Sequence, residues 1–358
     1  MKNLARTLIG IVIFLIILGT IIIFSARGYS FFISHISKVI FASAAFVLFA
    51  VIPYKYYKEI SKYMLMGIIL ALIYTLFSPA VKGASRWMNL GFMSFQPSEF
   101  AKIFLLIHLA VLIEKKGEMI KDFNNGLLYM LLWIGVVSLL IFIQPNVSTT
   151  IIVVSTSFIL LFVGGARISH LSGIIGSVGA IGALGAMALP HSRARILGFV
   201  KSITEGGSIN LQVLQSKIAL GSGGFFGLGI GQSRQSDLFL PEPHNDFVFS
   251  VVGEELGFLG ALAILFAYMA IFFVGLLIAK KAKDEFGQLL AFGISFTIVM
   301  SAFIHVGVGL GLLPTTGITL PFISFGGTSI IIFSISLGIL INIAMISGKH
   351  REMRRART

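Results

Sequence analysis

Residues 240–246 read Leu-Pro-Glu-Pro-His-Asn-Asp, and the long apolar run 247–279 begins directly after them. They close a polar segment, 188–245, that interrupts a chain built mostly of apolar runs and is termed the large loop below. The large loop is rich in Arg, Lys and Gly, and Asp246 stands where it meets the next apolar helix. This pattern predicts an all-α integral membrane protein whose carboxylate acts on an anionic, membrane-anchored substrate.

The composition excludes several classes of protein. Hydrophobic residues make up 56% of the chain, charged residues only 11%, and the mean hydropathy is +0.98, which is typical of a membrane protein and not of a soluble domain. The chain has no cysteine, so disulfides, thiolate catalysis and cysteine-based metal sites are excluded. The formal charge of +13 comes mostly from short turns between apolar runs, which indicates membrane topology and not nucleic-acid binding.

Ten apolar runs are long enough to cross about 30 Å of hydrocarbon as helices. They cover approximately 8–25, 34–53, 63–79, 99–114, 125–143, 147–165, 170–189, 247–279, 288–312 and 328–347. We therefore expect one polytopic domain over residues 1–358, with the large loop between helices seven and eight. The first run follows Lys2 and Arg6 and has no convincing small-residue cleavage site, which predicts an uncleaved anchor.

The basic residues predict the orientation of these helices. Seventeen of the 27 Lys and Arg residues lie at the termini and in the turns on the same side, whereas eight lie in the opposite turns. The positive-inside rule then places both termini in the cytoplasm. The large loop and the segments 80–98, 144–146 and 313–327 share the extracytoplasmic face in this topology.

Segment 82–102 holds the first group of candidate site residues. Arg86 suits bidentate phosphate binding, and Trp87 suits a bilayer interface. Glu99 and Lys102 stand three residues apart on a predicted helix, so their side chains can pair. An ordinary interfacial belt followed by a helix explains the same residues, and the sequence leaves both interpretations open.

The large loop holds a second group. Arg193 and Arg195 follow a predicted helix end, and Gln215 and Lys217 lie on a predicted amphipathic stretch. The glycines of 221–231 have neither a strand before them nor a Walker lysine after them, which argues against a nucleotide-binding fold. A solvated basic loop with a flexible hinge would have the same composition.

Two roles fit Asp246 equally well. As part of a helix start, Asn245 would cap the helix and Asp246 would favour its dipole by about 0.3–1 kcal/mol. As a general base, the carboxylate would accept a proton at a partly desolvated interface. Glu254 and Glu255 follow, about 12–14 Å deeper by helix rise, where acids normally face a bundle interior or cavity. Pairing with Lys38 or with a backbone group would explain them equally.

Several of these segments match a known pattern in order and content. They are Lys82–Trp87, Gln96–Glu99 with Lys102, Gln144–Pro145, Arg193 with Arg195, Gln215–Ser216, Leu240–Phe247, Gly253–Gly257 and Leu313–Gly327. Together they resemble the SEDS proteins (shape, elongation, division and sporulation), the family of FtsW, RodA and SpoVE, over nearly the whole chain. Asn146 departs from the Asp that is common in the family, so this position cannot supply a second carboxylate.

The resemblance implies a peptidoglycan glycosyltransferase that polymerises lipid II at the outer face of a bacterial cytoplasmic membrane. The family's essential acid corresponds to Asp246, implied to deprotonate an acceptor sugar hydroxyl while undecaprenyl pyrophosphate departs with inversion. Candidates for binding the pyrophosphate are Arg86, Lys102, Arg193, Arg195 and Lys217. Candidate supporting residues are Trp87, Glu99, Gln144, Gln215, Glu242, His244, Asn245, Glu254 and Ser324.

Cofactor and partner expectations also follow from the resemblance. The sequence has no cluster with metal-ligand spacing, so no protein metal site is expected, although Mg²⁺ or Mn²⁺ could enter with the pyrophosphate. The expected partners are a class B penicillin-binding protein and other membrane proteins of the divisome or elongasome, with no nucleic acid. Thr315–Pro321 looks more like the division branch, FtsW, than RodA. A RodA-type elongation polymerase, a lipid II flippase and a non-catalytic scaffold are the alternatives.

Overall fold

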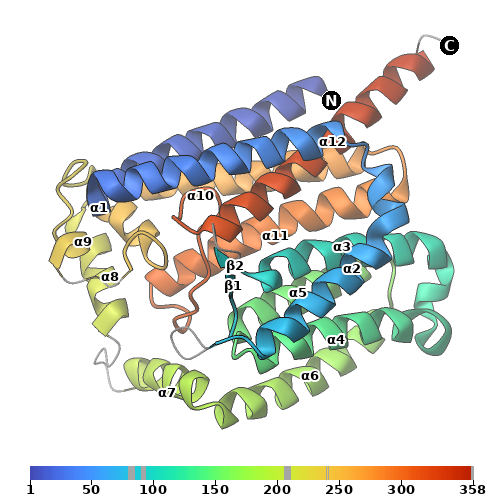
Figure 1. Ribbon diagram of the computed structural model, residues 1–358, viewed down its shortest axis with the longest axis horizontal. Coiled ribbons are helices and arrows are strands. Elements are labelled where there is room, and N and C mark those ends of the chain that lie inside the picture. Colours follow the sequence, from blue (N-terminus) through green and yellow to red (C-terminus); the bar gives the residue numbers. More distant parts are fainter. Residues whose placement is uncertain (80–84, 90–93, 205–210, 239, 241, 356–358) are drawn as a thin grey trace.

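The computed structural model describes residues 1–79, 85–89, 94–204, 211–238, 240 and 242–355, and it is almost entirely helical (Figure 1). The helices of the first half are α1 (Lys2–Val51), α2 (Lys55–Leu76), α3 (Pro97–Lys116), α4 (Leu128–Ile143), α5 (Val147–Val163) and α6 (Ile168–Ala188). Those of the second half are α7 (Pro190–Thr204), α8 (Leu211–Ser222), α9 (Arg234–Leu238), α10 (Val248–Lys280), α11 (Glu285–Gly309) and α12 (Gly327–Arg355). A 3₁₀ turn (Gly117–Lys121) and a π turn (Phe123–Leu127) join α3 to α4.

Two short strands complete the described secondary structure. β1 (Met88–Asn89) and β2 (Ser94–Phe95) pair antiparallel, with Met88 opposite Phe95 and Asn89 opposite Ser94. This hairpin comes directly before α3. It therefore holds the chain that carries Arg86 and Trp87 close to the start of that helix.

Helix α1 consists of two legs joined at Gly28. Gly28 has φ 75° and ψ −168°, a backbone conformation that glycine adopts without steric cost. The two legs run side by side in Figure 1 and match the first two predicted spans, and α1 packs against α12. Arg27 and Gly28 thus form the tip of a helical hairpin.

The all-α membrane architecture is confirmed. Seven helices within the described residues are long and apolar enough to cross a membrane, and all ten predicted spans fall on helices. Two of the ten spans share α1, α5 is a shorter apolar helix, and α3, which carries the span 99–114, is not among the seven. The total of ten crossings and the position of the large loop between helices seven and eight stay predictions.

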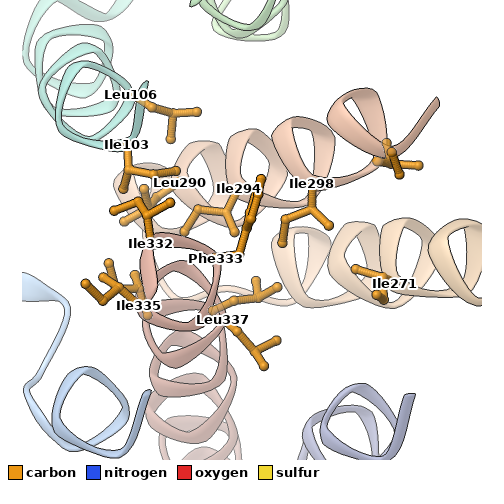
Figure 2. Close-up of a cluster of buried hydrophobic side chains, with 14 of the residues drawn as sticks. Ile103, Leu106, Ile271, Leu290, Ile294, Ile298, Ile332, Phe333, Ile335 and Leu337 are labelled. Carbon is orange, nitrogen blue, oxygen red and sulfur yellow. The ribbon is translucent and has the colours of Figure 1, made fainter. Parts of the chain in front are cut away.

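The core lies where α3, α10, α11 and α12 meet. Figure 2 shows Ile103 and Leu106 of α3 directed toward Leu290 and Ile294 of α11 and toward Phe333 of α12. These side chains are almost fully buried. In a lipid environment such close packing, and not the hydrophobic effect, holds helices together, so this cluster positions the polar site built on the same helices.

The polar segments collect at one end of the bundle, opposite the two chain termini. Helices α7, α8 and α9, all from the predicted large loop, lie together there, while both termini lie at the other end (Figure 1). We call these two ends the loop end and the terminal end. Their separation agrees with the predicted topology, whose orientation across a membrane stays a prediction.

Glu254 and Glu255 are buried, as expected, and both accept hydrogen bonds from backbone amides, while their depth in a membrane stays a prediction. Gly257 interrupts α10 with φ 69° and ψ −168°, a backbone conformation that glycine adopts without steric cost. Both carboxylates lie before this break, and Glu255 accepts a hydrogen bond from Ser25, close to the Arg27–Gly28 tip of α1. The two acids are therefore at the loop end.

The orientation can be tested with single cysteines, because the natural chain has none. Leu211 of α8 and Met353 of α12 are matched positions, with exposed fractions of 62% and 58%. We expect an impermeant thiol reagent to label Leu211→Cys in intact spheroplasts, and to label Met353→Cys only after permeabilisation, because basic turns are retained in the cytoplasm. The opposite labelling pattern would reverse the predicted topology.

Candidate functional site

The turn 242–246 is fixed by its own backbone and by the segment before α12. The amides of Asn245 and Asp246 both donate to the carbonyl oxygen of Glu242, each at 3.1 Å. The Ser324 hydroxyl donates to the Asn245 carbonyl at 2.8 Å, and the Phe325 amide donates to the His244 carbonyl at 3.0 Å. Contacts between two irregular segments thus hold the backbone beside Asp246, and they explain why Ser324, a predicted supporting residue, is buried.

Asp246 lies at the entrance to α10 but does not serve as the helix cap. The N-cap residue is Phe247, which has no side-chain acceptor, so the alternative in which Asn245 caps α10 is wrong. The Asn245 amide group instead donates to the Glu242 carboxylate at 3.2 Å. The Asp246 carboxylate lies 3.8 Å from the place that a Cβ of Gly317 would occupy.

Arg86 is anchored on the chain that joins α4 to α5. Its Nε–H donates to the Gln144 carbonyl at 3.0 Å, and its Nη2 donates to the Pro145 carbonyl. The Gln144 side chain is buried and donates to Leu72 and Thr75 of α2, at 3.0 and 2.7 Å. Gln144 is thus a support for Arg86, and the guanidinium is oriented by backbone acceptors before any ligand binds.

Arg86 and Arg195 line one cavity of about 150 Å³, which we call the arginine cavity. Burial, together with the charge of Arg195, lowers the pKa of Arg86. Burial also lowers the pKa of Arg195, while the negative charge of Asp246 opposes that change. Two cations held together without a full set of counter-charges form a site that favours an anion.

A second cavity of about 100 Å³ adjoins the arginine cavity, because Arg86, Asn146 and Thr316 line both. Trp87 and Glu99 also line this inner cavity. Glu99 is only 9% exposed and receives both its hydrogen bonds from Lys102 Nζ, each at 2.9 Å. The predicted pairing is confirmed, and Lys102 is directed to Glu99 at the inner end of the site.

An apolar groove of about 410 Å³ continues from the arginine cavity. Val147, Ile151 and Ile196 line both spaces, so the two are direct neighbours. The rest of the groove is formed by α4, α5 and α6, including Gly179 and Gly182. A cavity with two cations beside an apolar groove fits a molecule with an anionic head and a hydrocarbon tail.

Among the described residues that line the two cavities, four are predicted site residues: Arg86, Arg195, Trp87 and Glu99. The other predicted residues, Asp246 included, line neither cavity, and four of them have clearly different surroundings. Arg193 is exposed, and Gln215 is half-buried on α8. The Lys217 side chain lies against Gly311, at the end of α11. Glu254 accepts hydrogen bonds from Ser233 Oγ at 2.5 Å and from the amides of 234 and 235, so it holds the start of α9.

Other residues of the site were not identified from the sequence. Thr149 and Thr319 line the inner cavity, and Ser148 donates to the Thr316 carbonyl at 3.1 Å. Asn146 donates to Ser98 at 3.3 Å and caps α5 through the Thr149 amide. Small hydroxyl residues are common in loops and in membrane helices, so their type alone carried no usable signal.

The turn that holds Asp246 also contains a buried histidine. His244 accepts a hydrogen bond from Arg27 Nε at 3.2 Å, and its other ring nitrogen lies 3.6 Å from Glu242. No group of three or more His, Asp or Glu side chains that could hold a metal ion occurs within the described part of the chain.

Comparisons with known proteins identify relatives across the whole chain. A family model described as a cell cycle protein, which covers FtsW, RodA and SpoVE, matches residues 4–349. A probable peptidoglycan glycosyltransferase FtsW from Geobacter metallireducens is 35% identical over 309 residues, which cover 85% of this chain and 82% of the relative. Stage V sporulation protein E from Bacillus subtilis is 34% identical over 354 residues, covering 95% of this chain and 96% of the relative.

Solved structures share the fold. A chain from a peptidoglycan synthase complex, described as coordinating polymerization and crosslinking, aligns with a TM-score of 0.80 and 23% identity, over 95% of this chain and 97% of its own length. The rod shape determining protein RodA from Thermus thermophilus aligns with a TM-score of 0.72 and 23% identity, over 94% and 95% of the two chains.

The buried pair of Glu99 and Lys102 should contribute strongly to stability. Glu99→Gln leaves a buried ammonium without a counter-charge, so we expect the free energy of unfolding to fall by roughly 3–5 kcal/mol. Glu118→Gln is the matched control, because Glu118 and Lys121 form a pair of the same spacing whose side chains are 86% and 47% exposed. Thermal unfolding in detergent measures both, and equal shifts of the two midpoints would contradict the prediction.

Proposed function

The chain belongs to the FtsW, RodA and SpoVE family, and on this basis we propose that it is a peptidoglycan glycosyltransferase that polymerises lipid II. The observation that carries this proposal is the position of Asp246: its charge acts on Arg195, which lines the arginine cavity, and its carboxylate lies beside Gly317, which lines the inner cavity. A proton acceptor and a pair of cations then lie within one site. These are the groups that a sugar transfer with a pyrophosphate leaving group requires.

The shape of the site supports a lipid-linked substrate. The arginine cavity suits the pyrophosphate, because Arg86 and Arg195 are partly buried cations whose attraction for an anion is weakly screened by water. The adjoining apolar groove between α4, α5 and α6 suits the isoprenoid chain. Arg86 belongs to both polar cavities, so a bound pyrophosphate would lie beside the inner cavity as well.

In the proposed reaction Asp246 acts as the general base. Its carboxylate takes the proton of an acceptor sugar hydroxyl as the hydroxyl oxygen forms a bond to the anomeric carbon of the donor. The bond between that carbon and the pyrophosphate oxygen breaks, and undecaprenyl pyrophosphate leaves with the electron pair. Arg86 and Arg195 stabilise the negative charge that develops on the departing oxygen.

This single displacement inverts the anomeric carbon. A retaining reaction would need a second carboxylate as nucleophile, usually about 5 Å from the first. The family position that commonly holds such an acid is Asn146 here, and its amide is engaged with Ser98 and Thr149. An amide of this kind cannot form a glycosyl ester, which supports the inverting route.

Arg193, Lys217 and Lys102 are weaker candidates for contact with the pyrophosphate. Arg193 and Lys217 are exposed, and Lys102 is already paired with Glu99. They would act at longer range, through the positive potential of the site. A Mg²⁺ or Mn²⁺ ion that enters with the substrate would be held mainly by phosphate oxygens.

The biological setting is proposed from the relatives. Relatives named FtsW indicate a role in cell division more than in elongation. The likeness to a chain of a peptidoglycan synthase complex supports a class B penicillin-binding protein as partner, within a divisome of membrane proteins. We place the protein in a bacterial cytoplasmic membrane, with both termini in the cytoplasm and the loop end outside.

Asp246→Asn tests the general base, because Asn keeps the size of the side chain but cannot accept the proton. We expect polymerisation of lipid II by the purified protein with its transpeptidase partner to fall by about 10²–10⁴-fold, with unchanged thermal unfolding. Glu242→Gln should be only partly impaired, because Glu242 supports the turn. Near-normal glycan synthesis by Asp246→Asn would end this assignment.

The same assay separates the proposal from its alternatives. Detergent micelles contain no membrane to cross, so a flippase or a scaffold would build no glycan in them. Wild-type protein that binds its partner but leaves lipid II unpolymerised would therefore favour one of those functions.

Arg195→Lys tests the role of the arginine cavity. Lys keeps the charge but lacks the planar fork that binds two phosphate oxygens, so we expect turnover to fall at least about tenfold. The control is Arg234→Lys, because the Arg234 side chain is exposed on α9 and lines neither cavity. Equal turnover of the two variants in the lipid II assay would assign Arg195 to loop structure.

A further inference from the structure

Arg27 contacts the turn that carries Asp246, although 217 residues separate it from His244. It occupies the tip of the α1 hairpin, directly before the break at Gly28. Its Nε–H donates to Nδ1 of His244 at 3.2 Å, and its guanidinium lies 5.7 Å from the centre of the Phe31 ring. The tip of α1 is thereby attached to the turn 242–246.

The His244 ring is enclosed by aromatic side chains. The Phe31 and Phe325 rings lie against it, with centroids 4.9 and 5.3 Å away and edge-to-face geometry. The His244 side chain is only 7% exposed. A positive charge on this ring would be poorly hydrated and would lie next to a guanidinium, so protonation of the ring is costly.

The contact with Arg27 also decides which ring nitrogen carries the proton. A guanidinium can only donate, so His244 Nδ1 must accept and therefore has no hydrogen. In the neutral ring the hydrogen is then on Nε2, which faces the Glu242 carboxylate at 3.6 Å. Glu242 in turn receives the Asn245 amide and provides the carbonyl that holds the Asp246 amide.

We propose that Arg27 is a positioning residue for the sugar transfer: it holds His244 neutral and directed at Glu242, and so fixes the turn that presents Asp246. A second effect follows from the same contact. An imidazolium two residues from Asp246 would lower the affinity of the carboxylate for a proton, and Arg27 prevents that charge from forming. This inference rests on the proposed general-base role of Asp246.

The other charged groups near the ring do not replace Arg27. Glu242 is the carboxylate that faces the ring from the same turn, and it would favour protonation. From the second leg of α1, Lys38 and His35 lie on the Phe325 ring, with Lys38 Nζ 3.1 Å from its centre and the His35 ring stacked at 6.0 Å. The charge of Arg195 interacts with that of Asp246.

The test compares lipid II polymerisation at pH 7.5 and pH 5.5, by purified protein with its transpeptidase partner. In Arg27→Gln the ring no longer faces a guanidinium, and the amide oxygen can accept from a protonated Nδ1. An ordinary histidine titrates near pH 6.5, so kcat of Arg27→Gln should lose about tenfold more between the two pH values than kcat of the wild type. KM should stay unchanged, because Arg27 lines neither polar cavity.

Three further variants make the result specific. Arg27→Lys keeps the charge and should keep the wild-type pH dependence, and Arg27→Gln with His244→Gln should lose the extra dependence because the titrating ring is gone. Arg234→Gln removes an exposed arginine from the same end of the protein and should behave as the wild type. If Arg27→Gln does not fold, Arg27→Met, which retains the apolar stem, takes its place.

The outcomes separate the role of Arg27 from the proposed function. Wild-type activity with no extra acid sensitivity in Arg27→Gln would overturn the role of Arg27 and leave the glycosyltransferase proposal intact. Acid sensitivity that persists in the double variant would also overturn it, because another group would then be titrating. Wild-type protein without polymerase activity at either pH would instead overturn the proposed function on which the inference rests.

Discussion

The site at the loop end depends on one constraint: the backbone N–H and C=O groups of its irregular segments need hydrogen-bond partners. Peptide groups that leave a helix inside or near a bilayer are tolerated only where they bind other protein groups or line a polar cavity. The turn 242–246 and the segment 320–325 satisfy each other through the Ser324 hydroxyl and the Phe325 amide. Arg86 satisfies the carbonyls of Gln144 and Pro145 in the same way. The groups that stabilise these loops are therefore the groups that shape the site.

Charge placement follows from that arrangement. Arg86 and Arg195 come from distant parts of the chain, and burial lowers the pKa of both. Two desolvated cations repel each other, and that repulsion is relieved when an anion binds between them. The proposed leaving group, a pyrophosphate, carries such a charge. The same physics explains why Glu99 and Lys102 are paired: an isolated ion at that depth would be costly.

Two glycines bring the hairpin tips to this end of the molecule. Gly28 and Gly257 have nearly the same backbone angles, and each divides a helix into two legs. The break at Gly257 is packed against the glycine-rich segment, because the amides of Phe258 and Leu259 donate to the carbonyls of Gly224 and Phe225. The break at Gly28 presents Arg27 to His244. Glycine-rich sequence that looked like a flexible hinge thus provides close backbone contacts.

The sequence by itself determined the membrane class, the helical runs and the two ends of the bundle, because length, hydropathy and the spacing of basic residues are local properties. It also indicated Arg86, Arg195 and Asp246 through residue chemistry and family resemblance. Only the tertiary structure decided which of the basic residues share a cavity, that Asn245 does not cap α10, and that Glu254 and Glu255 lie at the loop end. The hydrogen bond from Arg27 to His244 is likewise visible only in the tertiary structure. These features depend on contacts between residues far apart in the chain, which no local pattern records.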